Sequence, residues 1–199
     1  MYLLKRNLFF IIVFVLIGVF PSCKQEHHIT SYYQVDSLLR DQIQLLTNTP
    51  LYLQKEAWVN SAHQDTLMAS LDSATWSNEL EMFTEIDWIN RPINQGGYTI
   101  LDEQNDPYSN LIIREYRANK PMAIRYLKLY YQDTPNKLRK LESLYEMESA
   151  LLSSKRKLTM EFTDLYNKNI LSSYSVEGEQ KLVMSDSVHY LIKGKVQFN

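Results

Sequence analysis

The sequence predicts an α+β protein in which N-terminal helices pack on a long-stranded antiparallel β-meander, a half-barrel-like sheet. Three observations lead to this prediction. Apolar residues recur at helical spacing in residues 31–46 and 72–90. From Tyr98 onward, apolar and polar residues alternate in long runs that are separated by Asn, Asp and Pro residues typical of turns. Fourteen tyrosines and only five glycines suit the surfaces of a sheet better than flexible linkers.

Residues 1–22 have the pattern of a signal peptide. Lys5 and Arg6 precede an uncharged run from Leu8 to Phe20, which is shorter than the roughly 20 apolar residues that span a bilayer. A proline and a serine end the run directly before Cys23, which is the single cysteine of the chain. The alternative is an uncleaved anchor helix in which this cysteine is incidental.

The small residue before Cys23 resembles the lipobox of bacterial lipoproteins, although Pro21 departs from the commonest form. This resemblance implies that the sulfur of Cys23 carries a diacylglyceryl group and that residues 1–22 are removed. Cys23 would then be the first residue of the mature chain, and its new amine would be acylated. Two or three acyl chains form a durable anchor, whereas one chain alone binds a membrane only marginally.

The residues that follow Cys23 indicate the compartment of such a lipoprotein. In lipoproteins of this type, an aspartate directly after the cysteine retains the protein in the inner membrane, and an acidic stretch sends it to the cell surface. Here Lys24 follows the cysteine, and Glu26 is the single acid of the polar tether 23–30. The resemblance therefore implies a lipid-anchored outer-membrane protein, which we expect on the periplasmic face.

The composition disfavours nucleic acid as a partner. The chain has 21 basic and 23 acidic side chains, and residues 1–22 contain two of the basic ones and no acid, so the mature chain has a formal charge of −4. A nucleic-acid-binding protein needs a basic surface. Residues 31–199 are numerous enough to bury a core, and we expect them to form a single α+β domain.

The first part of the domain is expected to be mainly helical. A helix over 31–46 is followed by a strand over 51–60 and a short strand over 66–69. A second helix begins at Asp72 or Ser73 and ends at the Asn-Arg-Pro sequence of residues 90–92. Its apolar stripe consists of Trp76, Leu80, Phe83 and Ile86.

This second helical segment carries a further resemblance. Its tryptophan, Glu-Leu pair, phenylalanine and Asp-x-x-Asn-x-Pro exit resemble a group of Bacteroidota-type lipoproteins of unknown function. In that group a helical N-terminal half precedes a β-meander. The resemblance brings no catalytic residue with it.

Seven strands are expected in the second part, near residues 98–103, 110–118, 122–132, 137–148, 155–165, 170–182 and 187–198. Residues 137–152 also fit a helical period, so a helix is an alternative there. A three-residue turn at 167–169 would place Phe162 opposite Tyr174, and a loop at 149–154 would place Glu148 opposite Lys155.

This register gathers apolar side chains on one face of the sheet and charged pairs on the other, as a sheet with one buried face requires. It also places Glu142 opposite Glu161, which is unfavourable. The expected apolar face consists of Leu141, Tyr145, Leu158, Met160, Phe162, Tyr174, Val176, Val188, Tyr190, Ile192, Val196 and Phe198.

The histidines and serines do not form a pattern typical of an active site or a metal site. His27 and His28 lie in the tether, and the chain offers no cluster of the four ligands that structural zinc needs. The segment from Ser185 to His189 lacks the G-x-S-x-G elbow of a hydrolase, and we interpret it as a turn and the start of a strand. We therefore expect no enzyme, no cofactor and no metal.

Two other residue groups have a structural and a functional interpretation. Glu142, Glu146 and Glu148 are expected to pair with Lys155 and Lys157 across the sheet rather than to act as catalytic carboxylates. The three tryptophans, Trp58, Trp76 and Trp88, are expected in the core, and a ligand groove is the alternative.

The sequence thus favours a non-enzymatic, membrane-anchored envelope lipoprotein that acts as a binding module or as an accessory subunit of a membrane complex. Its partners would be a membrane, reached through Cys23, and a protein or lipid ligand. The alternative is a carrier or sensor of acyl chains or lipoproteins, similar to the periplasmic lipoprotein carriers, in which a curved sheet and a few helices enclose acyl chains. An apolar cavity between helices and sheet would support this alternative.

Overall fold

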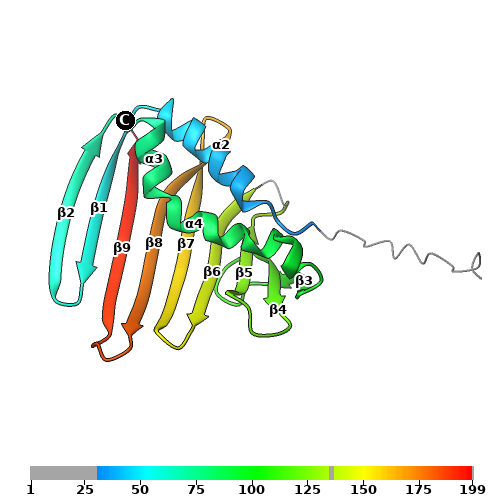
Figure 1. The fold of residues 1–199 in the computed structure, drawn as a ribbon. Helices are drawn as coiled ribbons and strands as arrows, with labels where there is room; N and C mark the ends of the chain where they lie inside the picture. Colours follow the sequence, from blue (N-terminus) through cyan, green and yellow to red (C-terminus); the bar gives the residue numbers. More distant parts are fainter. Residues whose placement is uncertain (1–30, 135–136, 199) are drawn as a thin grey trace, which may run out of the picture.

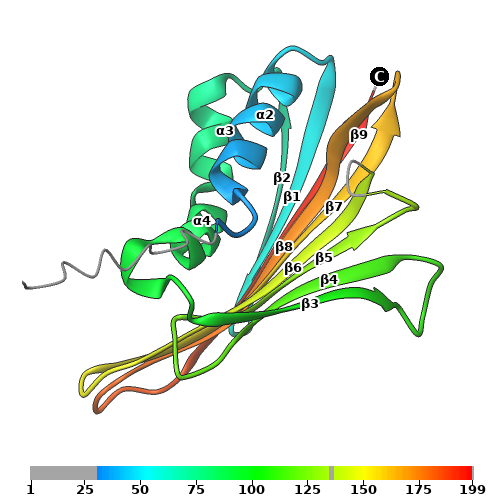
Figure 2. The ribbon, with the colours of Figure 1, turned by 90° about the vertical axis from the view of Figure 1, so that its right-hand side faces the viewer.

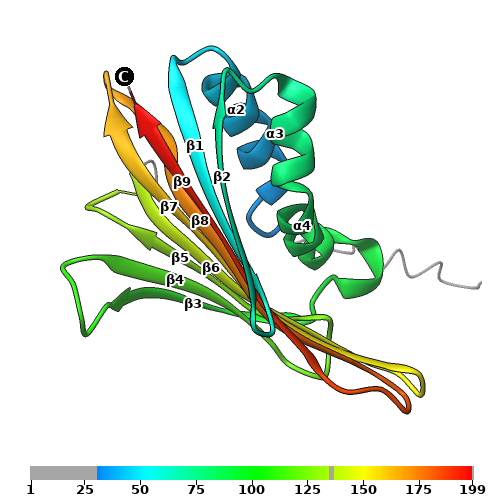
Figure 3. The same ribbon diagram turned by 90° about the vertical axis from the view of Figure 1, so that its left-hand side faces the viewer.

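The computed structural model describes residues 31–134 and 137–198. The expected signal peptide 1–22 and lipidation site Cys23 lie outside the described residues. The described chain is a mixed α+β structure in which one long antiparallel sheet dominates (Figure 1). Helices cover one face of this sheet and leave the other face open (Figures 2 and 3). None of the described helices is long and apolar enough to cross a membrane.

The helix layer consists of α2 (Val35–Thr47), α3 (Ser73–Glu79), α4 (Glu81–Thr84) and the 3₁₀ turns η1 (Glu85–Asn90) and η2 (Pro92–Asn94). The expected start at Asp72 is confirmed, because its carboxylate accepts a hydrogen bond from the backbone N–H of Thr75 at 2.8 Å.

The expected continuous helix over 72–90 is wrong, because the segment breaks into α3, α4 and η1. The spacing of its buried side chains explains the break. Leu80, Phe83, Ile86 and Ile89 recur every three residues, and each is at most 1% exposed. A 3₁₀ helix has three residues per turn and keeps such a row on one side, whereas an α-helix would rotate it away from the sheet.

The strands are β1 (Leu51–Val59), β2 (Ala62–Ala69), β3 (Tyr98–Asn105), β4 (Ile112–Ala118), β5 (Ile124–Tyr131), β6 (Leu138–Glu148), β7 (Leu152–Leu165), β8 (Lys168–Leu182) and β9 (Val188–Phe198). Every strand expected after residue 97 is present, with ends within three residues of the expected ones. The helical alternative for 137–152 is wrong. The expectation of a helical N-terminal half is not confirmed either, because residues 51–69 form a β-hairpin.

The sheet order is β2-β1-β9-β8-β7-β6-β5-β4-β3. Strands β3 to β9 form a simple meander, in which each strand pairs with the next one along the chain. The hairpin of β1 and β2 joins this meander at its far end, because β1 pairs antiparallel with β9 from Leu51 opposite Phe198 to Val59 opposite Tyr190. The last strand of the chain is therefore an interior strand of the sheet.

The side chains between the helices and the sheet form one core, as the two-faced pattern predicts. Helix residues such as Trp76 and Phe83 pack with sheet residues such as Leu127, Leu141 and Met160, and all of these are fully buried. Most side chains of the expected apolar face are buried there. Val188 differs, because it lies at the start of β9 and is 39% exposed.

The predicted register between β7 and β8 is wrong by three residues next to the turn and by two residues beyond a β-bulge. The chain turns at Tyr166 and Asn167, whose φ values are 48° and 62°, so the turn has two residues instead of three and the positive φ values of a type I′ turn. Met160 consequently lies opposite Tyr174, and Phe162 lies opposite Leu171 after a β-bulge. Beyond the bulge the shift of two residues keeps the side chains on their predicted face, because side chains alternate with period two. Between the bulge and the turn the shift is three residues, so Leu171 of β8 changes face and is buried in the core.

The predicted register between β6 and β7 is wrong by two residues. Glu148 lies opposite Ser153, and Glu146 lies opposite Lys155. The unfavourable pair predicted for Glu142 is absent, because this residue lies opposite Thr159.

The interior position of β9 generates a prediction about truncation. A chain that ends at Ser185 would lose the partner of both β1 and β8, and the detached β1–β2 hairpin would be marginally stable alone. We expect this variant to be insoluble or to lack a cooperative thermal transition by circular dichroism, since it exposes two unpaired strand edges. A chain that lacks only Asn199 serves as the control. A cooperative, wild-type-like transition of the shorter chain would contradict the interior role of β9.

Candidate functional site

The open face of the sheet, which points away from the helices, carries polar side chains in regular rows. Opposed residues of neighbouring strands lie side by side, so each row crosses the sheet at right angles to the strands. One row runs from β4 to β2 through Glu115, Lys128, Glu142, Thr159, Ser175, Lys193, Glu56 and Asp65. Charged residues occupy both ends of this row, and two small hydroxyl residues occupy its middle.

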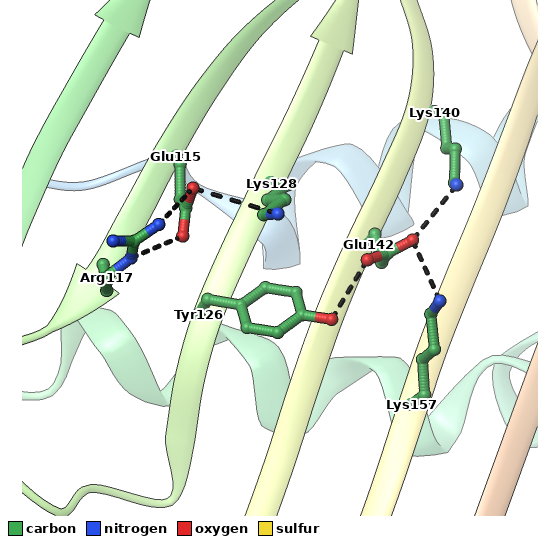
Figure 4. Close-up of polar contacts among 7 residues, drawn as sticks. All are labelled: Glu115, Arg117, Tyr126, Lys128, Lys140, Glu142 and Lys157. Carbon is green, nitrogen blue, oxygen red and sulfur yellow. Dashed lines mark hydrogen bonds and ion pairs between the residues drawn. The ribbon is translucent and has the colours of Figure 1, made fainter. Parts of the chain in front are cut away.

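Glu115 of β4 is a buried carboxylate on this face. Its side chain is 4% exposed and accepts two hydrogen bonds from Arg117, at 2.8 Å from Nε and 3.1 Å from Nη2 (Figure 4). The Nζ atom of Lys128 on β5 lies 3.9 Å from the second oxygen. The two-pronged geometry fixes the orientation of the carboxylate and the guanidinium.

Glu142 of β6 is the second buried carboxylate of the row, with a side chain that is 10% exposed. The hydroxyl of Tyr126 donates to Oε1 at 3.0 Å, and the Nζ atoms of Lys140 and Lys157 lie 3.1 and 3.3 Å from Oε2 (Figure 4). Burial opposes ionisation, but the hydrogen bond and charge of Lys140, the charge of Lys157 and the Tyr126 hydroxyl outweigh it. The pKa of Glu142 is therefore lowered.

Two tyrosines of β5, Tyr126 and Tyr130, remain neutral on this face. Burial and the charge of Glu142 raise the pKa of Tyr126 well above its ordinary value, and they raise the pKa of Tyr130 to about 12. The ring of Tyr130 also lies 5.0 Å from the Nζ atom of Lys140. Aromatic rings and lysines thus alternate beside the two carboxylates.

A shallow trough of about 500 Å³ lies in the open face where β7, β8, β9 and β1 meet. Its centre is low because Thr159, Ser173 and Ser175 are small, and its rim is high because longer charged side chains surround them. The rim residues are Glu56, Glu161, Lys193 and Lys195. The trough therefore presents hydroxyl groups at its centre and both signs of charge at its edge.

Two contacts order the side chains of this trough. The hydroxyl of Ser173 donates to a carboxylate oxygen of Glu161 at 2.8 Å. The Nζ atom of Lys193 lies 5.3 Å from the ring centroid of Trp58, whose other neighbour is the stacked ring of His63 at 4.6 Å. Contacts between neighbouring strands thus hold Glu161 and Lys193 of the rim in place.

The structure separates the three tryptophans that we expected in the core. Trp76 is fully buried there, and Trp88 packs at its border with its ring edge-to-face on Tyr145. Trp58 is different, because it lies on the open face beside the trough. The core prediction is therefore wrong for Trp58, and the reason is its even position in β1, whose odd positions Leu51 and Leu53 face the helices.

The three glutamates of β6 behave differently from one another. Glu146 forms an ion pair with Lys155 at 2.9 Å, and Glu142 forms one with Lys157 at 3.3 Å, so the predicted structural pairing is confirmed for these two. Glu148 instead lies at the exposed end of the strand opposite Ser153.

The segment from Ser185 to His189 does not assemble a nucleophilic site. The hydroxyl of Ser185 donates to the backbone carbonyl of its neighbour Asp186, and the Nε2 atom of His189 lies 3.9 Å from Glu179 on the next strand. His27 and His28 lie outside the described residues. Among residues 31–134 and 137–198, no group of three or more His, Cys, Asp or Glu side chains could hold a metal ion.

Sequence reasoning missed Glu115 and Tyr126. Both stand at alternate positions of short strands, where the pattern predicts solvent-facing residues. An available signal was the sequence Arg-Glu-Tyr-Arg at 114–117, which places a glutamate and an arginine two residues apart on one face of a strand.

Comparison of the chain with protein-family models, with curated proteins and with solved structures gave no significant match.

The lowered pKa of Glu142 generates a prediction about stability and pH. A carboxylate with a lowered folded-state pKa stabilises the fold above its unfolded pKa, about 4.5, and this contribution disappears as the pH falls through the folded value. We expect Glu142→Gln to flatten the decline of the free energy of unfolding between pH ~6 and pH ~3, measured by urea denaturation. The pKa of Glu146 is also lowered, chiefly by its hydrogen bond with Lys155, so part of the decline should remain.

Glu148→Gln is the matched control, because it makes the same substitution at the exposed end of the same strand. Identical pH profiles for Glu142→Gln and the wild type would contradict a structural role for the Glu142 network.

Proposed function

We propose that this protein is a non-enzymatic envelope lipoprotein, anchored to the periplasmic face of the outer membrane through Cys23, which binds a polar protein segment on the open face of its sheet. The observation that supports this proposal is the ordered, ion-paired polar face with a trough at its centre. In the described part of the chain, no helix covers this face (Figures 2 and 3). An anchored domain with one ordered polar face is suited to act as an accessory subunit of a membrane complex.

The geometry of the open face suits reversible and selective binding. Glu115 and Glu142 are already desolvated and paired, so a ligand need not strip water from them or order their partners. Preorganisation of this kind reduces the entropy that is lost on association. Both signs of charge around the trough select partners by complementarity rather than by overall attraction.

The size of the trough favours a protein segment as the ligand. A volume of about 500 Å³ accommodates a few side chains of a loop or an extended strand. Hydroxyl groups at the centre can donate to and accept from backbone amides, and the lysines and glutamates of the rim can pair with charged side chains of either sign.

The alternative function, a carrier of acyl chains within a half-barrel-like sheet, would need space between the helices and the sheet. In the structure this interface is filled by side chains such as Trp76, Phe83 and Ile86, each with no exposed surface. A carrier would therefore require the helix layer to move away from the sheet. The observed packing favours the open face as the binding surface.

The anchor is tested by replacing its cysteine. Cys23→Ser should abolish the incorporation of a fatty-acid analogue in labelled cells and leave the precursor uncleaved, because serine has no sulfur to accept the diacylglyceryl group. Ser22→Ala is the matched control, since it keeps a small residue before Cys23 and should remain acylated. Label that persists on the serine variant would exclude the lipobox.

The binding face is tested with a photo-cross-linking amino acid in the full chain in its native membrane. Placed at Ser175, inside the trough, it should yield one protein adduct of defined mass. The same amino acid at Ser77, which is exposed on the helix layer, is the control and should yield none. Reversing the rim with Lys193→Glu and Lys195→Glu should reduce the adduct at least tenfold. Equal adducts at both positions, or none at Ser175, would contradict the proposal.

A further inference from the structure

Two β-hairpins project beyond the helix layer at one end of the sheet (Figure 2). One is the turn between β6 and β7, and the other is the turn between β8 and β9. The backbone N–H of Val183 in the second turn donates to the carbonyl of Leu151 in the first at 3.0 Å, so the two turns form one surface.

This surface is apolar. Leu151 is 72% exposed, Leu182 51%, Val183 54% and Met184 is completely exposed. We name these four residues the apolar tip. Met147 at 37% and Val188 at 39% extend it onto the end of the sheet. Contiguous exposed apolar side chains of this kind mark contact surfaces in soluble domains, whereas single ones need no explanation.

The strand pattern explains why part of the apolar tip is exposed. Leu182 and Val188 occupy positions that, nearer the middle of β8 and β9, belong to Val176 and Val196 and face the core. The alternation continues to the ends of the strands, but the helix layer does not (Figure 2). The apolar face of the sheet therefore emerges from under the helices.

We propose that the apolar tip enters the surface of a lipid bilayer. A stable protein interface takes about 20–30 residues on each side, whereas the tip and its extension have six apolar side chains. The tip also projects from the domain, so fluid lipid can surround it. The choice of a bilayer as the occupant rests on the proposed anchor at Cys23. The eight peptide units from Cys23 to Ser31 span at most about 28 Å, so a domain anchored there stays close to the bilayer surface.

The backbone of the two turns is suited to a lipid environment, where unpaired polar groups are unfavourable. The N–H of Ser185 donates to the carbonyl of Leu182 at 3.2 Å, and the N–H of Ser149 donates to the carbonyl of Leu152 at 2.8 Å. With the bond between the turns, the tip satisfies several of its backbone groups internally. Glu148, Lys181 and Asp186 flank the tip and would remain at the level of the head groups.

The contact is tested with the full chain in vesicles of phosphatidylethanolamine and phosphatidylglycerol, with a photo-cross-linking amino acid at position 184. Tyr166 is the matched control position. Both residues are highly exposed turn residues with positive φ, 61° at Met184 and 48° at Tyr166, and they lie beyond opposite ends of β8. The fifteen residues of β8 separate them by roughly 50 Å.

Phospholipid adducts at position 184, detected by mass spectrometry and at least tenfold more abundant than at position 166, would support the contact. The double variant Leu151→Ser, Val183→Ser should reduce their yield severalfold. Equal yields at both positions, no lipid adduct at 184, or adducts there only with a second copy or another protein would each overturn it.

The same sample separates this inference from the proposed function. The mass of the peptide that contains Cys23 shows whether the anchor is present. An acylated Cys23 without lipid adducts at position 184 would overturn the tip contact and leave the anchor standing. An unmodified Cys23 with lipid adducts at position 184 would support the tip contact and reject the anchor.

Discussion

The pairing of β1 with β9 is the interaction on which the rest of the structure depends. It joins residues that are 131 to 147 positions apart in the chain, and loop closure over such a distance is entropically unfavourable until the contacts along the pair form. The same pairing positions the helix layer. Glu79 of α3 forms an ion pair with Lys55 of β1 at 2.7 Å and accepts a hydrogen bond from Tyr174 of β8 at 2.7 Å. One carboxylate thus ties α3 to strands on both sides of β9.

The helices are held to one another by a cap that comes from a distant segment. Gln34 makes no side-chain hydrogen bond to the start of α2, which leaves the first N–H groups of this helix without a local partner. Asp87 of η1 supplies the partner, because its carboxylate accepts from the backbone N–H groups of Val35 at 2.9 Å and Asp36 at 3.4 Å. Asn90 then donates to the carboxylate of Asp87 at 3.0 Å. The 3₁₀ segment therefore orients α2 as well as filling the core.

The sequence predicted the two faces of the sheet better than its register or its connections. Alternation decides which face Met160 and Tyr174 occupy, and this survives an error of two residues. The register between β7 and β8 depends on the turn at Tyr166 and Asn167. Tyr166 has a positive φ at the first position of this turn, and tyrosine is not a residue that turn preferences favour there. The β1–β9 pairing and the buried state of Glu115 depend on which strands become neighbours, which periodicity along one segment does not encode.

The trough and the apolar tip arise from the same strand, which places them at a defined separation. Ser175 and Leu182 are seven residues apart in β8, about 23 Å along the strand. With the tip in a bilayer, a segment bound in the trough would lie roughly this far from the lipid. The trough opens on the face away from the helices, whereas the tip lies where two strand pairs turn back, so neither contact blocks the other (Figure 2). An anchored domain of this geometry would present its polar face at a fixed height and orientation above the membrane, which a flexible tether alone does not provide.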